Sequence, residues 1–178
     1  MRYLCIDGDF LTYHLSHQTK KRYQVTSNED TVIEVEDFET GIKEEIDISD
    51  NFIELIDYEL AEKVLYEFII ELEEQFNAQL KYIAFTSRNN IKKQINENYK
   101  ADRNDVGAKA FSTSALRNII RNIYSEYLLE FDNVECDDLL STKITQDKNN
   151  YYIVVAEDTD FTTLKNITFY NKRTDETQ

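Results

Sequence analysis

Apolar and polar positions along the chain fall into blocks that predict short buried strands separated by helices. Three short runs, at 2–6, 81–86 and 152–155, are rich in apolar residues, and polar residues follow each of them. Such runs are typical of strands buried on both faces of a parallel sheet. Between the first two runs, an apolar stripe recurs at helical spacing: Leu60, Val64, Leu65, Phe68, Ile69, Leu72 and Phe76. Strand, helix and strand in this order indicate a right-handed crossover and an α/β fold with a mainly parallel sheet.

The remaining segments predict a hairpin, further helices and a last strand. Residues 31–36 and 42–48 alternate Val and Ile with acidic residues on either side of Gly41, which favours a β-hairpin. We expect it to form an acidic insertion over residues 23–50. We also expect a helix from Phe10, a helix behind the capping hydroxyls at 112–114, a helix over 137–144, a short strand over 167–170 and a frayed polar tail over 171–178.

The net charge of −15 is unevenly distributed along the chain. The segment from Ser87 to Arg121 carries eight basic and three acidic residues, so its net charge is +5 while the rest of the chain carries −20. A basic strip beside an acidic body suits an enzyme that holds phosphates on one side and cations on the other. We expect a basic clamp over residues 87–112.

Length and cysteine content narrow the class of protein. A chain of 178 residues predicts one domain over 1–178 with a substantial core. The two cysteines imply no disulfide framework, which favours a reducing cytoplasm. No apolar run approaches the ~20 residues of a membrane span, and the N-terminus lacks a secretion signal pattern. We therefore expect a cytoplasmic protein without a membrane partner.

Carboxylates gather in three places, two of them directly after predicted strands. With 35 acidic residues in the chain, any one cluster is more often a solvated loop than a metal site. Parallel neighbouring strands would bring all three to the carboxyl edge of one sheet, where α/β folds place their sites. Oxygen ligands without nearby His or Cys pairs favour Mg²⁺ or Mn²⁺. The candidate ligands are Asp7, Glu135, Asp137, Asp138, Asp158 and Asp160.

Four blocks of sequence, in register, resemble the bacteriophage 5′–3′ exonucleases of the flap-endonuclease superfamily. They are LCIDGDFLTY at 4–13, AFTSRNNIKK at 84–93 running into NYKADR at 98–103, VECDDL at 134–139, and VAEDTDF at 155–161. The first block is similar to the family's opening strand with its metal-binding Asp. The second is similar to the strand and basic arch entry, the third to the Glu-Ala-Asp-Asp element, and the fourth to the strand that ends in Asp-x-Asp.

The resemblance implies a three-layer PIN-like, resolvase-like domain with a basic helical arch, and a nuclease dependent on one or two divalent ions. Two such ions would lie about 4 Å apart and activate a water for attack on a phosphodiester. Asp158 would take part in catalysis. Lys100 and Arg103 would bind the scissile or an adjacent phosphate, and Tyr99 would stack on a terminal base. Further substrate-binding candidates are Lys92, Lys93, Arg117 and Arg121.

The implied substrates are DNA 5′ ends, flaps or branches, or RNA paired with DNA, during phage-type replication or degradation. For a phage protein the location would be the host cytoplasm. By this resemblance, Ser87, or Thr86 with a different gap, stands where many relatives have another metal-site Asp, and the family's C-terminal helix–hairpin–helix part would be missing. A protein partner would then supply that function.

Two other readings stay open. The chain could be a catalytically weakened module that binds nucleic acid or a protein partner. It could also be a small ribonuclease of the PIN type, which shares an acidic site at the sheet edge. The Tyr-Lys-x-x-Arg element at 99–103 argues against the second alternative.

Overall fold

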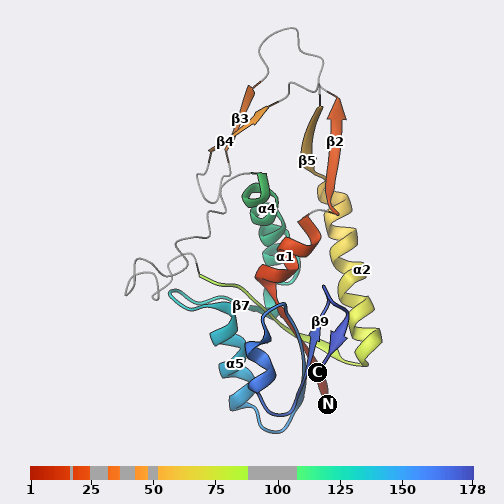
Figure 1. The fold of residues 1–178 in the computed structure, drawn as a ribbon, viewed down its shortest axis with the longest axis vertical. Coiled ribbons are helices and arrows are strands. Elements are labelled where there is room, and N and C mark those ends of the chain that lie inside the picture. The colour runs from red at the N-terminus through yellow and green to blue at the C-terminus, as the bar shows by residue number, and fades with distance from the viewer. Residues whose placement is uncertain (17, 25–31, 37–42, 48–51, 88–107) are drawn as a thin grey trace. The chain divides into compact units, whose positions relative to one another are not determined.

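The computed structural model describes residues 1–16, 18–24, 32–36, 43–47, 52–87 and 108–178 (Figure 1). The chain forms two compact units. The first unit comprises Met1–Leu11, Tyr66–Arg103 and Tyr124–Gln178, and the second comprises Thr12–Leu65 and Asn104–Ile123.

The first unit is built on a six-stranded sheet with the order β10-β9-β8-β1-β6-β7. The strands are β1 (Arg2–Asp7), β6 (Gln79–Ala84), β7 (Leu128–Leu129), β8 (Tyr151–Val155), β9 (Ile167–Asn171) and β10 (Glu176–Thr177). All neighbours pair in parallel except β9 and β10. The predicted α/β fold with a mainly parallel sheet is confirmed.

The described helices match the periodic segments of the sequence. They are α1 (Gly8–Ser16), α2 (Tyr58–Phe76), α4 (Ala108–Ile123) and α5 (Cys136–Gln146), with short 3-10 turns η1 (Ser125–Tyr127) and η2 (Thr159–Thr163). Helix α4 begins a turn before the predicted capping hydroxyls, because strong helix formers such as Ala108 and Ala110 precede them. No helix in the described ranges combines the length and apolarity needed to cross a membrane.

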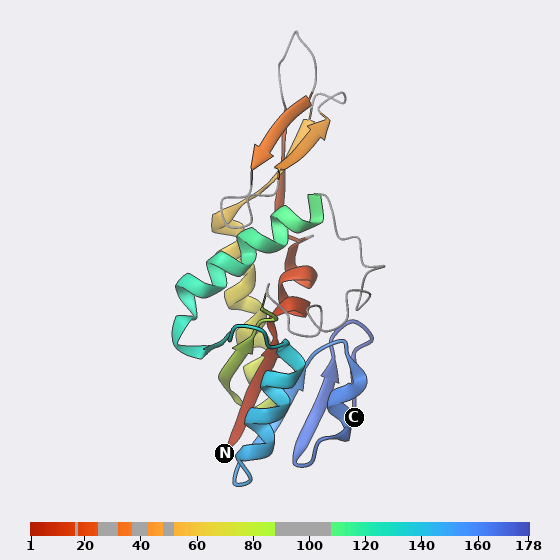
Figure 2. The ribbon, with the colours of Figure 1, turned by 90° about the vertical axis from the view of Figure 1, so that its left-hand side faces the viewer.

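Helix α5 covers one face of the sheet (Figure 2). Alternate strand residues such as Cys5, Val154 and Phe169 form one buried cluster with Leu139 and Leu140 of the helix. Because side chains alternate between the two faces of a strand, the odd-numbered residues of β1 point towards α5. Asp7, the last residue of that strand, belongs to the same set.

The C-terminal half of α2 belongs to the first unit and packs on the sheet through its buried side. The ring of Phe76 lies 5.0 Å from the ring of Tyr170 on β9, edge to face. Glu73 accepts a hydrogen bond of 2.6 Å from the amide of Leu80 at the start of β6. The predicted apolar stripe is confirmed by the burial of Leu65, Phe68, Ile69 and Leu72.

The second unit contains two antiparallel strand pairs. β3 (Val32–Glu36) pairs with β4 (Lys43–Asp47), as the expected hairpin requires. β2 (Lys20–Gln24) pairs with β5 (Phe52–Ile56), a pairing that the sequence pattern did not indicate. The boundaries of the insertion at 23–50 and of the clamp at 87–112 stay predictions.

The prediction of a frayed C-terminal tail is wrong. The amide of Phe169 donates to the carbonyl of Gln178 and the amide of Gln178 donates back, both at 2.8 Å. Asp175 makes the turn with φ 57°, and its carboxylate accepts a 2.6 Å hydrogen bond from the hydroxyl of Tyr170. These contacts hold β10 against β9, although the segment carries no apolar periodicity.

A polar network joins β6, β8 and the end of α5 near the amino ends of the strands. The ammonium of Lys81 lies 3.2 Å from Asp147, 3.1 Å from the hydroxyl of Tyr152 and 4.1 Å from the ring centroid of Tyr3. The Tyr152 hydroxyl donates to Asp147 at 2.6 Å. Burial, with the contact to Asp147, raises the pKa of Tyr152 to about 12, so the hydroxyl stays a donor at neutral pH.

Tyr152→Phe should lower the free energy of unfolding by about 1–3 kcal/mol, because it removes a hydrogen bond to a charged group. The measurement is a urea unfolding curve at neutral pH. Tyr151→Phe is the matched control, because the neighbouring Tyr151 hydroxyl forms exposed hydrogen bonds. Its effect should stay within about 0.5 kcal/mol. Equal effects of the two changes would contradict the role of the network.

Gly8 is fixed by a close approach between the end of β1 and the end of β6. A Cβ at this position would lie 2.5 Å from Cε1 of Phe85 and 2.6 Å from the carbonyl oxygen of Ala84. Gly8→Ala should therefore destabilise the protein by about 1–3 kcal/mol through overpacking. Adding Phe85→Leu should not restore stability, because the backbone clash with Ala84 remains. An unchanged unfolding midpoint for Gly8→Ala would contradict this packing.

Candidate metal centre

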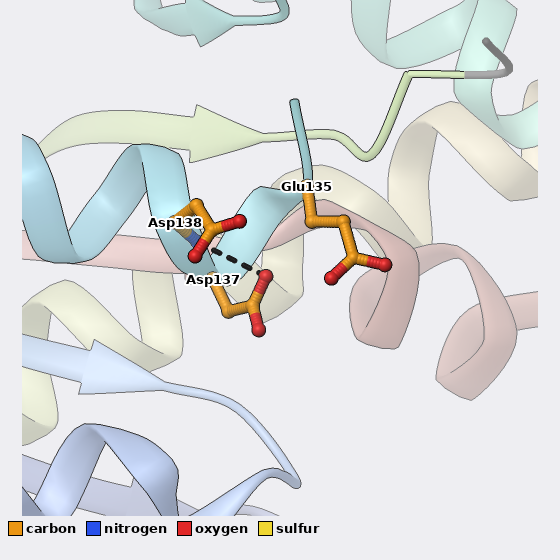
Figure 3. A group of neighbouring side chains, drawn as sticks. All are labelled: Glu135, Asp137 and Asp138. Carbon is orange, nitrogen blue, oxygen red and sulfur yellow. Dashed lines mark hydrogen bonds between the residues drawn. The ribbon is translucent and has the colours of Figure 1, made fainter. Parts of the chain in front are cut away.

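A group of three carboxylates stands at the start of α5. Glu135, Asp137 and Asp138 each offer an oxygen, and these oxygens lie within 4.8 Å of one another (Figure 3). Glu135 is 2% exposed, Asp137 is half-buried and Asp138 is exposed. The amide of Asp138 donates to Oδ1 of Asp137 at 3.0 Å. The structure brings together three of the six predicted metal ligands in this carboxylate group.

The backbone before α5 places Glu135 at the N-cap without using its side chain as a cap. Asn133 has φ 66°, a left-handed conformation that Asn adopts more readily than most residues, and it turns the chain towards the helix. Glu135 has extended φ and ψ angles of −84° and 155°, and its side chain makes no capping hydrogen bond. The helical ladder begins with the amide of Leu139 donating to the Glu135 carbonyl at 3.1 Å.

Asp7 connects the end of β1 to this group. Its Oδ1 accepts hydrogen bonds from the amides of Asp9 at 2.9 Å and Phe10 at 3.1 Å, which caps α1. The thiol of Cys136 lies close enough to the same carboxylate to lower its pKa. Since Cys136 lies between Glu135 and Asp137, Asp7 stands beside the second acidic cluster, although it is outside the group of three carboxylates.

The carboxylate of Asp7 is held in an unfavourable electrostatic environment. Burial raises its pKa to about 6, and the charge of Asp9 adds to the rise, although hydrogen bonds from the amides of Phe10 and Asp9, and the nearby Cys136, oppose it. Burial and the nearby Asp7 charge raise the pKa of the Cys136 thiol well above its usual value. The thiol is therefore protonated at neutral pH.

Asp158 and Asp160 follow β8, the strand beside β1. Asp158 caps η2 by accepting a 3.0 Å hydrogen bond from the amide of Asp160. Both side chains are exposed and stand outside the group of three carboxylates. Phe161 anchors the turn, because it is buried in the same cluster as Cys136. The third predicted cluster thus lies at the carboxyl end of the neighbouring strand, and its part in ligation stays a prediction.

The predicted substrate-binding residues are not tested by this structure. Lys92, Lys93, Tyr99, Lys100 and Arg103 lie outside the described residues. Arg117 and Arg121 lie on α4 in the second unit.

The sequence pointed to Thr86 only as an alternative to Ser87, and it assigned no role to Asp9 or Cys136. The amide of Thr86 donates to Oδ2 of Asp9 at 3.2 Å, and the Thr86 hydroxyl accepts from the amide of Cys136 at 3.1 Å. Ser87, at the position of the family's additional Asp, is buried and its amide donates to the Val134 carbonyl at 2.9 Å. The only signal in the sequence was the position of these residues at strand ends and inside an acidic block.

The donor set fits a hard divalent cation. The group offers carboxylate oxygens only, which is the ligand chemistry of Mg²⁺ and Mn²⁺. Negative charge is concentrated here, because the buried Glu135 lies beside Asp137 and the side chain of Cys136 lies near Asp7. A bound cation would neutralise this charge. The residues at this edge of the sheet therefore fit a divalent metal centre.

Asp7→Asn should stabilise the metal-free protein at neutral pH. The raised pKa means that the charged carboxylate lowers the free energy of unfolding, by at most about 3 kcal/mol. This loss is complete above pH about 6 and absent below pH about 4, where the carboxyl is protonated in both the folded and the unfolded state. Asn keeps an oxygen acceptor for the two amides that cap α1. The measurement is urea unfolding in a chelator across this pH range. A loss of stability at neutral pH, or a gain that persists at pH about 3, would contradict the shift.

No protein-family model matches the sequence, and no curated protein sequence matches it. Solved structures do match. Bacteriophage T5 5′-exonuclease with bound zinc ions aligns with a TM-score of 0.62 and 11% identity over 100% of this chain and 58% of that one. A bacteriophage T5 flap endonuclease in complex with DNA and metal ions gives 0.59 and 11% over 99% and 57%. A T5 protein co-crystallized with metal ions gives 0.59 and 12% over 99% and 57%.

At this level of identity, the likeness to the T5 structures shows a shared fold. The mixed α/β architecture with its mostly parallel sheet is the PIN-like fold of the T5 exonuclease. The chain spans just under three fifths of the length of these neighbours.

Proposed function

We propose that this protein is a divalent-metal-dependent 5′ nuclease that hydrolyses phosphodiester bonds of DNA. The observation that carries the proposal is the carboxylate group of Glu135, Asp137 and Asp138, with Asp7 beside it at the carboxyl edge of a parallel sheet. The fold adds support, since its T5 neighbours are described as a 5′-exonuclease and a flap endonuclease bound to metal ions and DNA.

Asp7, Glu135 and Asp137 would hold one or two cations, with Asp138, Asp158 and Asp160 as further ligands. The bound cation would lower the pKa of a water that attacks the phosphorus and offset charge on the phosphate oxygens. Oxygen ligands favour Mg²⁺ or Mn²⁺, although one neighbour was solved with zinc. The carboxylates of this chain would orient the water and exclude other anions through their charge.

The basic residues of the chain would supply the substrate contacts. Lys100 and Arg103 would neutralise the scissile or a neighbouring phosphate, and Tyr99 would stack on a terminal base. Lys92, Lys93, Arg117 and Arg121 would extend the phosphate contacts. The substrates would be 5′ ends, flaps or branches of DNA, or RNA paired with DNA, in phage-type replication or degradation within a host cytoplasm.

A specific observation favours a second candidate, a catalytically weakened module that binds nucleic acid or a partner protein. At the end of β6, Thr86 and Ser87 bring no charge, and their amides are bonded to Asp9 and Val134. A centre with fewer carboxylates binds cations less tightly. Such a module would act together with a protein partner.

Cleavage of 5′-labelled duplex, flap and RNA–DNA substrates tests the two candidates. Wild-type protein with Mg²⁺ or Mn²⁺ should shorten the labelled strand, and a chelator should abolish the cleavage. Asp137→Asn and Glu135→Gln should lower the rate at least about 100-fold, because cation ligation is lost. Glu74→Gln, an exposed change on α2, should leave the rate unchanged.

Two results would separate the candidates. Salt-dependent binding of branched DNA without cleavage under any divalent ion would favour the weakened module. Cleavage that persists at the wild-type rate in Asp137→Asn and Glu135→Gln would show that the nuclease centre lies elsewhere.

A further inference from the structure

Thr86 lies where the starts of α1 and α5 meet the end of β6. Its amide donates to Oδ2 of Asp9 in the first turn of α1 at 3.2 Å. Its hydroxyl oxygen accepts a 3.1 Å hydrogen bond from the amide of Cys136, the first residue of α5. One residue therefore bonds to the beginnings of α1 and α5, each of which has acidic residues in its first turn.

The contact from Thr86 replaces a local helix cap. The first amides of a helix have no acceptor within it, and a side chain at the N-cap commonly supplies one. Glu135 occupies the N-cap of α5 but its side chain makes no capping bond. The acceptor comes instead from Thr86, fifty residues earlier in the chain. The start of α5 is thereby tied to β6, and the Glu135 carboxylate offers an oxygen to the group with Asp137 and Asp138 (Figure 3).

Cys136 makes the second connection, from α5 to β1. Its side chain is 3% exposed and belongs to the same buried cluster as Cys5 of β1. The thiol lies close enough to Asp7 that the Asp7 charge raises the pKa of Cys136, and Cys136 in turn lowers the pKa of Asp7. Gly8, the residue after Asp7, has no Cβ, which lets the ends of β1 and β6 approach each other at the same place.

We propose that Thr86 and Cys136 are positioning residues that set the spacing between Asp7 and the carboxylates of Glu135 and Asp137, and so determine the affinity of the centre for a divalent cation. This inference rests on the proposed metal-dependent function and adds two residues without charge to the machinery. Residues that hold metal ligands in place through hydrogen bonds typically change affinity or activity by about 10–100-fold when removed.

Two conservative pairs of variants test this inference. Thr86→Val removes the acceptor at nearly constant volume, and Thr86→Ser keeps it. Cys136→Ala removes the buried side-chain group beside Asp7, and Cys136→Ser keeps a polar group of similar size there. The readout is the Mn²⁺ dissociation constant of the full chain, from free-Mn²⁺ electron paramagnetic resonance, together with the unfolding midpoint of each variant in a chelator.

Thr86→Val and Cys136→Ala should each raise the Mn²⁺ dissociation constant about tenfold or more, while the two Ser variants should stay within about threefold of wild type. Where cleavage is measurable, kcat should fall more than KM rises, because these residues do not touch the substrate. Tyr152→Phe is the control, since it removes a part-buried hydrogen bond near the other end of the strands. It should lower stability without changing Mn²⁺ affinity.

The outcomes distinguish this inference from the proposed function. Folded Thr86→Val and Cys136→Ala proteins that bind Mn²⁺ as tightly as wild type would overturn the inference alone. If the Ser variants lose as much Mn²⁺ affinity as Thr86→Val and Cys136→Ala, or if Tyr152→Phe also loses affinity, the effect is general destabilisation and the inference is overturned as well. If Thr86→Val does not fold, the Cys136 pair decides by the same criterion. A wild-type chain without Mn²⁺ affinity would remove the proposed function and the inference with it.

Discussion

Burial of carboxylates is the constraint on which this structure depends. Burial, and after it the charge of Asp9, raises the pKa of Asp7, which shows the cost of placing a charge at the end of β1. A fold without a need for this charge would place neutral side chains there. The same edge carries Glu135, almost wholly buried, beside Asp137. The chain gives up stability at this edge, and a divalent cation is the partner that would restore it.

The rest of the first unit holds these charges in place. The cluster between α5 and the sheet fixes the helix at its buried side, and the network of Lys81, Asp147 and Tyr152 ties its far end to the strands. With both regions fixed, the start of α5 stays close to the end of β1 despite the cost of burying carboxylates there. Gly8 brings the strand ends closer still, since a larger residue would meet Phe85. Packing energy thus offsets the electrostatic cost.

Much of this arrangement could be predicted from the sequence. The buried strands around Ile6 and Val154, the apolar stripe of α2 and the acidic first turn of α5 have strong local signals, namely β-branched runs and helical spacing. The six acidic ligand candidates came from the same local patterns. The T5 structures share the fold at only 11–12% identity, so the likeness lies in the pattern of elements more than in the residues.

Other features had no local signal. The cap of α5 comes from Thr86, and neither propensity nor periodicity points to a partner fifty residues away. The strand β7 has two residues, too few for a period, and β10 forms through backbone bonds of Gln178 in a polar segment. Cys136 stood inside a recognised motif, but its position beside Asp7 became visible only when β1 and α5 were brought together.

The central claim is that the carboxylates at the end of β1 and the start of α5 bind a divalent cation. The most direct measurement is an anomalous difference map from crystals of this protein soaked in Mn²⁺. We predict a peak that is coordinated by carboxylate oxygens of Glu135 and Asp137 and that lies on the side of this group facing Asp7. A map without a peak at this edge of the sheet, in crystals where Mn²⁺ binds elsewhere or not at all, would contradict it.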